Sequence, residues 1–247
     1  MTTLRPPLTR NDLVTADMLA GLPAPVQRYL TYTGVIGKPW IETVRVAYKG
    51  QFRMAANRPW MGVRAEQFYT TNPPSFQWNA RLLMKGLPIA RGSDTYKDAH
   101  GHMFGKLLGL FTIFDARGEE LDQGTMIRYL NEIIWFPIAF LGDNITWAAV
   151  DDHAADVTFT DGGKSVSARM FFDDFGRLMS FVTQRYAEEK GRYRLAPWAT
   201  PMTEYGKLAG LNLPIRGEAV WYFPEGDLSY ARLTLTEIAY NVPVPTY

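Results

Sequence analysis

The stretch Arg128-Tyr-Leu-Asn-Glu-Ile-Ile-Trp-Phe-Pro137, RYLNEIIWFP, places two opposite charges four residues apart in a largely apolar segment. A helix turns by roughly 100° per residue and so brings Arg128, Glu132 and Trp135 onto one narrow face. Its opposite half is apolar and carries Met126, Leu130, Ile133 and Ile134. Most of this helix is therefore expected to be buried, and its polar stripe must face either water or a cavity.

This pattern predicts a central helix over 121–136, which Pro137 ends because proline cannot continue a helix. Two shorter helices are expected before it. One covers 11–21, and the other covers 23–32, with proline near its start and Gly34 after its end.

Nearly all of the remaining chain has the pattern of β-strands separated by turn residues. The predicted strands are 41–54, 62–71, 75–84, 87–97, 107–116, 144–151, 155–160, 165–173, 177–188, 192–208, 217–226 and 227–240. Strands with so little helix between them pair as antiparallel hairpins, because parallel winding requires crossover helices.

Apolar residues occur on both faces of these strands, as in LSYARLTLTEIAY (228–240). Such a sheet is either covered on both sides or curled around a lumen. The predicted fold class is mainly β: one strongly curved antiparallel sheet, or unclosed barrel, of about eleven strands with the helix on its concave side. We expect a single domain over 1–247. Its parts are N-terminal helices (1–35), a first meander (36–116), the central helix (121–136) and a second meander (144–241).

Several local patterns support a resemblance to known proteins. They are LPAPVQRYL (22–30), AEQFY (65–69), the Phe76-Gln-Trp78 pair, RYLNEIIWFP (128–137), the strand start at Trp147, and Pro197-Trp198. These patterns are similar to those of an uncharacterised bacterial family of unknown function. The order of elements resembles the unclosed barrels of the bacterial lipoprotein-carrier and lipoprotein-receptor fold. The cofactor-free violacein-pathway enzyme that rearranges an indole dimer is similar in architecture.

The composition of the 247-residue chain is that of a globular protein, with 47% hydrophobic and 21% charged residues. Aromatic residues make up 14%, which suits a large core and equally a pocket for a flat or apolar ligand. The lack of cysteine excludes disulfides, a thiol nucleophile, iron–sulfur clusters and cysteine-based zinc sites.

Charge and hydropathy argue against several kinds of partner. The formal net charge is +1 and no run of five or six like charges occurs, so neither nucleic acid nor an anionic membrane surface is indicated. No window approaches the roughly 18 apolar residues of a spanning helix, and the N-terminus has no signal-peptide core. We therefore expect no transmembrane segment and a cytoplasmic location.

No metal or cofactor site is predicted. His100, His102 and Asp98 fall on one side of a strand, but KDAHGH has the composition of a surface hairpin turn. The segment DGGKS (161–165) lacks the first glycine of a phosphate loop and lies between two strands rather than before a helix.

Three interpretations of Arg128 and Glu132 are open. The first is an exposed ion pair, although arginine before glutamate is the weaker helical orientation. The second is a buried structural pair that fixes the helix against the concave sheet. In the third, the pair lies on a cavity wall, with Glu132 as general acid or base and Arg128 as anchor. The apolar surroundings favour a pair that faces the inside of the curved sheet.

Glu66 is a further catalytic candidate. It is either a solvent-facing strand residue or an inward carboxylate, and in the second case it would meet Arg91, Asp94 or Glu132. Two inward carboxylates would raise the pKa of one of them and form an acid–base pair. A ligand-binding role is considered for Arg91 and for aromatic residues that otherwise pack in the core, namely Trp78, Trp135, Trp198 and Tyr205.

Two functions remain, and the first is slightly favoured. A binding protein would hold an apolar or aromatic small molecule or an acyl chain in the curved-sheet cavity. A cofactor-independent lyase, isomerase or cyclase would position an aromatic substrate there, with Glu132 moving a proton and Arg128 holding an anionic group. A purely structural partner protein is the least favoured class, because it leaves the polar stripe unexplained.

Overall fold

The helices and strands can be described for residues 9–189 and 191–245 in a computed structural model. The first half of the chain contains η1 (Ala16–Met18), α1 (Ala24–Thr33), β1 (Thr43–Phe52), β2 (Met61–Thr71), β3 (Pro74–Met84), β4 (Leu87–Lys97), β5 (His100–Leu107) and β6 (Phe111–Ala116). The middle contains α2 (Glu119–Glu132), η2 (Ile133–Trp135) and η3 (Pro137–Leu141). The second half contains β7 (Ile145–Asp151), β8 (Ala154–Asp161), β9 (Lys164–Phe172), β10 (Leu178–Glu189), β11 (Arg192–Leu208), β12 (Leu211–Phe223) and β13 (Gly226–Tyr240).

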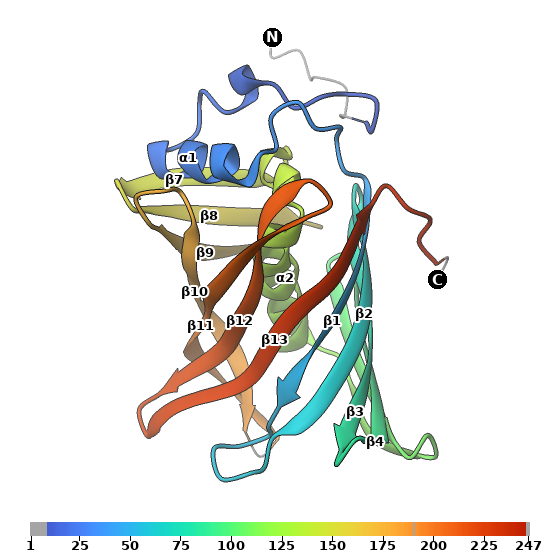
Figure 1. The fold of residues 1–247 in the computed structure, drawn as a ribbon. Coiled ribbons are helices and arrows are strands. Elements are labelled where there is room, and N and C mark those ends of the chain that lie inside the picture. Colours follow the sequence, from blue (N-terminus) through green and yellow to red (C-terminus); the bar gives the residue numbers. More distant parts are fainter. Residues whose placement is uncertain (1–8, 190, 246–247) are drawn as a thin grey trace.

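All of these strands belong to one antiparallel sheet that curves around α2 (Figure 1). Their order is β6-β5-β4-β3-β2-β1-β13-β12-β11-β10-β9-β8-β7. Each half of the chain is therefore a meander of hairpins, and the pairing of β1 with β13 joins the two halves. Within the described residues the edge strands β6 and β7 do not pair with each other, so the barrel is not closed.

The predicted curved, unclosed antiparallel sheet is confirmed, but the predicted number of about eleven strands is wrong, because the sheet has 13. The strand that the sequence pattern did not indicate is β5. Its inward positions include Gly101 and Gly105, which lack the side chains that mark a strand. The turn before it consists of Asp98 and Ala99, so His100 and His102 lie on the strand itself.

The helices lie where the sequence pattern predicts them, but their lengths differ from the prediction. Helix α1 matches the predicted segment 23–32 and ends at Gly34, whose φ of 77° lets its N–H bond back to Leu30 and Thr31. The α-helical part of α2 ends at Glu132, and 3₁₀ turns continue the chain past Pro137. The segment 11–21 forms only the short η1.

Helix α2 is buried on nearly all sides, because it follows β6 at one edge of the sheet and crosses the concave side to the other edge. It packs against β4 and β5 on one side and against β9 and β10 on the other. Its buried residues include apolar and polar side chains alike. None of the helices within residues 9–189 and 191–245 combines the length and apolar character needed to cross a membrane.

Close approach of α2 to β5 depends on Gly101. A Cβ at this position would lie 2.5 Å from Thr125 Oγ1 and 3.0 Å from the Leu121 carbonyl oxygen on the helix. We expect Gly101→Ala to lower the free energy of unfolding by about 1–3 kcal/mol, as overpacking does, in urea denaturation monitored by circular dichroism.

A second substitution distinguishes overpacking from other effects. Thr125→Ala removes the two nearest atoms, so in the double variant Gly101→Ala should cost less than it does alone. Gly21→Ala is the matched control, because nothing lies within 4 Å of its Cβ. Equal losses for Gly101→Ala with and without Thr125→Ala would contradict the proposed packing.

Candidate functional site

Arg128 lies at the centre of a buried polar cluster between α2 and the concave face of the sheet. Its Nε donates to Glu132 Oε1 at 2.8 Å, and its Nη1 donates to Asp94 Oδ2 at 2.5 Å. Its Nη2 donates to Gln67 Oε1 at 3.0 Å. The side chains of Arg128 and Glu132 are only 16% and 10% exposed, so the pair faces the inside of the curved sheet.

Glu132 is held on both carboxylate oxygens. While Oε1 accepts from Arg128, Oε2 accepts from Gln67 Nε2 at 2.7 Å and from the Tyr69 hydroxyl at 2.9 Å. Strand β2 supplies both of these donors because Gln67 and Tyr69 are two residues apart and share its inward face. The carboxylate therefore has three donors, as a buried charge requires.

Aromatic rings cover the Arg128 guanidinium. Its Cζ lies 5.0 Å from the ring centre of Phe76 and 4.9 Å from that of Trp78, which is the range of cation–π contacts. Both residues belong to β3, next to β2 in the sheet. The ionic cluster is thus enclosed by strands β1 to β4 and by α2.

Burial affects the groups of this cluster differently. Burial raises the pKa of Asp94, and Arg128 only partly offsets it. For Arg128, burial opposes the charge, but Glu132, Tyr48 and Asp94 outweigh it and raise the pKa well above its usual range. The guanidinium is therefore firmly charged because it has two carboxylates, whereas the charge on Asp94 is costly mainly because it is buried and, to a lesser extent, because Glu132 is nearby.

A second arginine, Arg185 of β10, lies on the other side of α2. Its Cζ is 5.0 Å from the ring of Trp198 and 5.9 Å from that of Trp221. The Tyr230 hydroxyl accepts from Trp198 Nε1 at 3.1 Å and from Arg185 Nη1 at 3.4 Å. A Cβ on Gly124 of α2 would lie 3.4 Å from Arg185 Nε, so a glycine there lets the arginine approach the helix.

Three buried polar atoms in this interior have no hydrogen-bond partner among the described residues: Trp78 Nε1, Asp94 Oδ1 and Arg185 Nε. Trp78 and Asp94 are directly opposite each other on β3 and β4. A donor and an acceptor so placed can bind one polar atom of a water molecule or a ligand between them.

The other residues selected from the sequence lie in different places. Glu66 is on the outer face of β2, because its neighbours Ala65 and Gln67 point inward, and it pairs with Arg45 at 2.6 Å. Arg91 is exposed on the outer face of β4. The structure therefore does not bring Glu66 or Arg91 to the Arg128 cluster.

Of the remaining aromatic candidates, Trp135 is buried in the core and Tyr205 is half-buried. Trp135 donates from Nε1 to the Pro214 carbonyl oxygen at 3.2 Å and its ring lies 5.7 Å from that of Tyr48. The Tyr205 hydroxyl donates to the Leu178 carbonyl oxygen at 3.0 Å. Trp78 covers Arg128 and Trp198 covers Arg185, as described above.

Sequence reasoning gave no role to Tyr48, Gln67 and Tyr69 of the Arg128 cluster, nor to Arg185 and Tyr230 on the other side of α2. One signal was present. In AEQFY the inward face of β2 reads Ala65, Gln67 and Tyr69, so a glutamine occupies a position that burial would otherwise give to an apolar residue.

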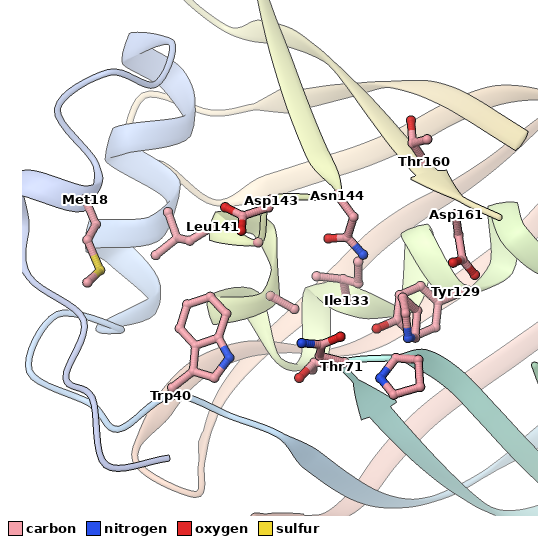
Figure 2. A pocket seen from close by; sticks show the side chains of 15 residues that line it. Met18, Trp40, Thr71, Tyr129, Ile133, Leu141, Asp143, Asn144, Thr160 and Asp161 are labelled. Atoms are coloured by element: carbon pink, nitrogen blue, oxygen red, sulfur yellow. The ribbon is translucent and has the colours of Figure 1, made fainter. Parts of the chain in front are cut away.

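A cavity of about 570 Å³ lies at the end of the sheet near α1, outside the Arg128 cluster. Figure 2 shows Trp40 at one side of it and Tyr129 and Asp161 at the other. Its wall is largely apolar and includes Met18, Trp40, Pro73, Pro74, Tyr129, Ile133, Ala139 and Leu141. Its polar groups come from Thr71, Asn72, Asp143, Asn144, Thr160 and Asp161.

A protein-family model described as a family of unknown function, DUF6544, matches residues 12–233. A solved LolA superfamily protein from Nitrosomonas europaea is 12% identical, with a TM-score of 0.44, and the match covers 94% of this chain and 96% of that protein. A DUF1329 family protein from Desulfovibrio piger is 8% identical, with a TM-score of 0.43, and the match covers 91% of this chain and 95% of that protein. No curated protein matches the chain. The family match confirms the resemblance to an uncharacterised family of unknown function that the local sequence patterns indicate.

The buried ion pair predicts strong coupling between its partners. We expect Arg128→Ala to lower the free energy of unfolding by about 3–5 kcal/mol, because it leaves the carboxylates of Glu132 and Asp94 without their counter-charge. Glu132→Ala should cost less, because Asp94 still compensates the charge of Arg128. The double variant should lose clearly less than the sum of the two, in urea denaturation. The exposed pair Arg232 and Glu218, with N···O of 3.2 Å, is the control and should couple by less than about 1 kcal/mol. Additive losses at Arg128 and Glu132 would contradict a buried pair.

The pKa of Asp94 predicts a pH dependence of stability. Burial raises this pKa above its usual 3.8, so the folded protein holds the proton more tightly than the unfolded chain does. The resulting stabilisation is present at low pH and is lost as the pH rises from about 4 through the raised pKa. We expect the stability of Asp94→Asn, relative to the unchanged protein, to increase with pH over this window. Urea denaturation at a series of pH values measures it, and a relative stability that falls with pH would disprove the prediction.

Proposed function

This chain belongs to the DUF6544 family, whose function is unknown, and we propose that it binds an apolar or aromatic small molecule that carries a cationic or hydrogen-bond-donating group. The site is the cavity next to α1. A single observation carries the proposal: the cavity combines apolar and aromatic side chains with polar groups, and its volume of about 570 Å³ is within the usual range of small-molecule sites.

The side chains of the cavity wall favour a ligand with an apolar or aromatic part. Tyr129 of α2 and Ile133 of η2 are almost fully buried, so they form a rigid part of the wall. Trp40 is 7% exposed and offers a ring on which a flat ligand can stack. Such a ligand would exclude water from apolar surface, which is the main source of affinity in pockets of this kind.

The polar groups support the proposed charge preference. Asp143 and Asp161 are the charged residues among those that line the cavity, and both are acidic. Asp161 Oδ2 accepts from the Tyr96 hydroxyl at 2.5 Å, which fixes its side chain. No ion pair involves Asp143 within the described residues, so its carboxylate is available to a ligand amine. An anionic ligand would be repelled at the same place.

Catalysis by Glu132, the alternative that the sequence leaves open, has less support. Both of its oxygens accept hydrogen bonds, and three donors occupy most of the roughly four acceptor positions of a carboxylate. Glu132 also does not line the cavity of about 570 Å³, although its helix neighbours Tyr129 and Ile133 do. The contacts of Glu132 favour a structural role, in which it holds α2 against the sheet.

Tryptophan fluorescence tests the proposed site. We expect 2-phenylethylamine to change the emission saturably, 2-phenylethanol to do so more weakly, and 3-phenylpropionate to have the smallest effect. Trp40→Phe should remove most of the change, because Trp40 is a wall residue. Trp60→Phe is the matched control, since Trp60 lies in the loop between β1 and β2, away from the lining residues.

Neutralising Asp143 tests whether the acidic residues of the cavity bind the ligand amine. Asp143→Asn should weaken amine binding roughly fivefold, the effect of losing one ion pair of about 1 kcal/mol, and should leave alcohol binding unchanged. Calorimetric titration measures both. Binding of the carboxylate as tightly as the amine, or responses that survive Trp40→Phe in full, would argue against the proposal.

A further inference from the structure

Five cationic side chains form a straight row across the outer face of the sheet. Their alignment follows from strand register: Lys49 of β1 is opposite Arg64 of β2, Arg64 is opposite Arg81 of β3, Arg81 is opposite Arg91 of β4, and Arg91 is opposite Lys106 of β5. We call this set the cationic row. At about 4.8 Å between strands it is about 19 Å long.

All five side chains point away from the barrel interior, because their strand neighbours point inward. Tyr48, Val63, Ala80 and Ala90 are buried next to Lys49, Arg64, Arg81 and Arg91. Gly105, next to Lys106, is covered by the ring of Phe114. The cationic row is therefore a surface feature and takes no part in the Arg128 cluster.

The cationic row has no acidic partner within the described residues. None of its members is in an ion pair there. The nearest acidic positions along the strands, Glu66 and Asp115, are engaged by Arg45 and His102. Like charges directly opposite each other destabilise a sheet, and a bound anion would offset this repulsion.

Beside the cationic row, two neighbouring turns expose large apolar side chains. The β3–β4 and β5–β6 turns lie side by side, since Leu108 N–H donates to the Ile89 carbonyl oxygen at 2.8 Å. The apolar side chains of these turns are between 39% and 77% exposed. We call them the apolar tips; they are Met84, Leu87, Leu107, Leu108, Leu110 and Phe111.

We propose that this end of the sheet docks onto the surface of an anionic lipid bilayer. The apolar tips enter the interfacial region of the bilayer, and the cationic row contacts the lipid phosphates and anionic headgroups. Both observations point to the same occupant, because exposed apolar residues flanked by lysine and arginine are what binding to an anionic bilayer surface requires.

A bilayer suits the shape of this surface better than an acidic protein does. The apolar tips belong to two turns that project from the end of the sheet. A hollow of about 500 Å³ lies beside Lys49 and Arg64, but none of the apolar tips lines it. A fluid interface accepts projecting side chains without a matching cavity. The proposed ligand cavity opens at the other end of the sheet, so docking would leave it accessible.

Vesicle flotation of the full chain tests the proposal. We expect binding to vesicles of phosphatidylcholine with phosphatidylglycerol, weaker binding to phosphatidylcholine alone, and loss of binding as salt is added. Arg81→Gln with Arg91→Gln should reduce partitioning about 25-fold, or about fivefold for each charge removed. The matched control, Lys97→Gln with Lys207→Gln, changes the net charge equally at the cavity end of the sheet and should leave partitioning nearly unchanged.

A label tests insertion of the tips directly. The chain has no cysteine, so Leu110→Cys accepts one polarity-sensitive fluorophore. Its emission should shift to the blue on addition of anionic vesicles, whereas the same label at Lys97→Cys should not respond. Equal binding to neutral vesicles, or no blue shift at position 110, would overturn the proposal. Concentration-dependent dimers that Phe111→Ser abolishes, without vesicle binding, would overturn it in favour of a second copy of the chain.

Discussion

The guanidinium of Arg128 is a positive charge inside a protein, and the position of α2 depends on how that charge is balanced. Asp94 from β4 and Glu132 from α2 itself supply the two carboxylates, and β2 supplies the amide of Gln67. If α2 moved away from β2 and β4, the charge would lose partners without gaining water, which is costly in a buried site. The cluster therefore fixes one helix against several strands at once.

Small residues make this arrangement sterically possible. Gly101 lets α2 approach β5, and Gly124 on the helix leaves room for Arg185 of β10. The helix is consequently held from both halves of the sheet, although the edge strands β6 and β7 do not pair within the described residues. An open barrel can be rigid in this way, because the helix connects the two sides that hydrogen bonds between the edges would otherwise join.

Local patterns predicted the hairpins, the buried helix and the inward ion pair, because each depends on residues close together in sequence. Strand β5 was not predicted because its inward glycines lack the side chains typical of a strand. The sequence also did not decide which face of β2 carries Glu66, because both faces of the strands have apolar residues. A cavity within the curved sheet was predicted, but this position was not, since its wall comes from segments as distant as Met18 and Asp161. The cationic row also has no sequence signature: its members are 10 to 17 residues apart, and only the register aligns them.

The order of the strands has a consequence for synthesis on the ribosome. Every partner named for Arg128 lies between Tyr48 and Glu132, so the ionic cluster needs only the chain up to the end of α2. Strand β1, by contrast, must keep one edge unpaired until β13 is made, because Val44 pairs with Tyr240. The nascent chain thus carries a templating strand edge and one uncovered side of α2 until its last residues emerge, which is a state that favours aggregation.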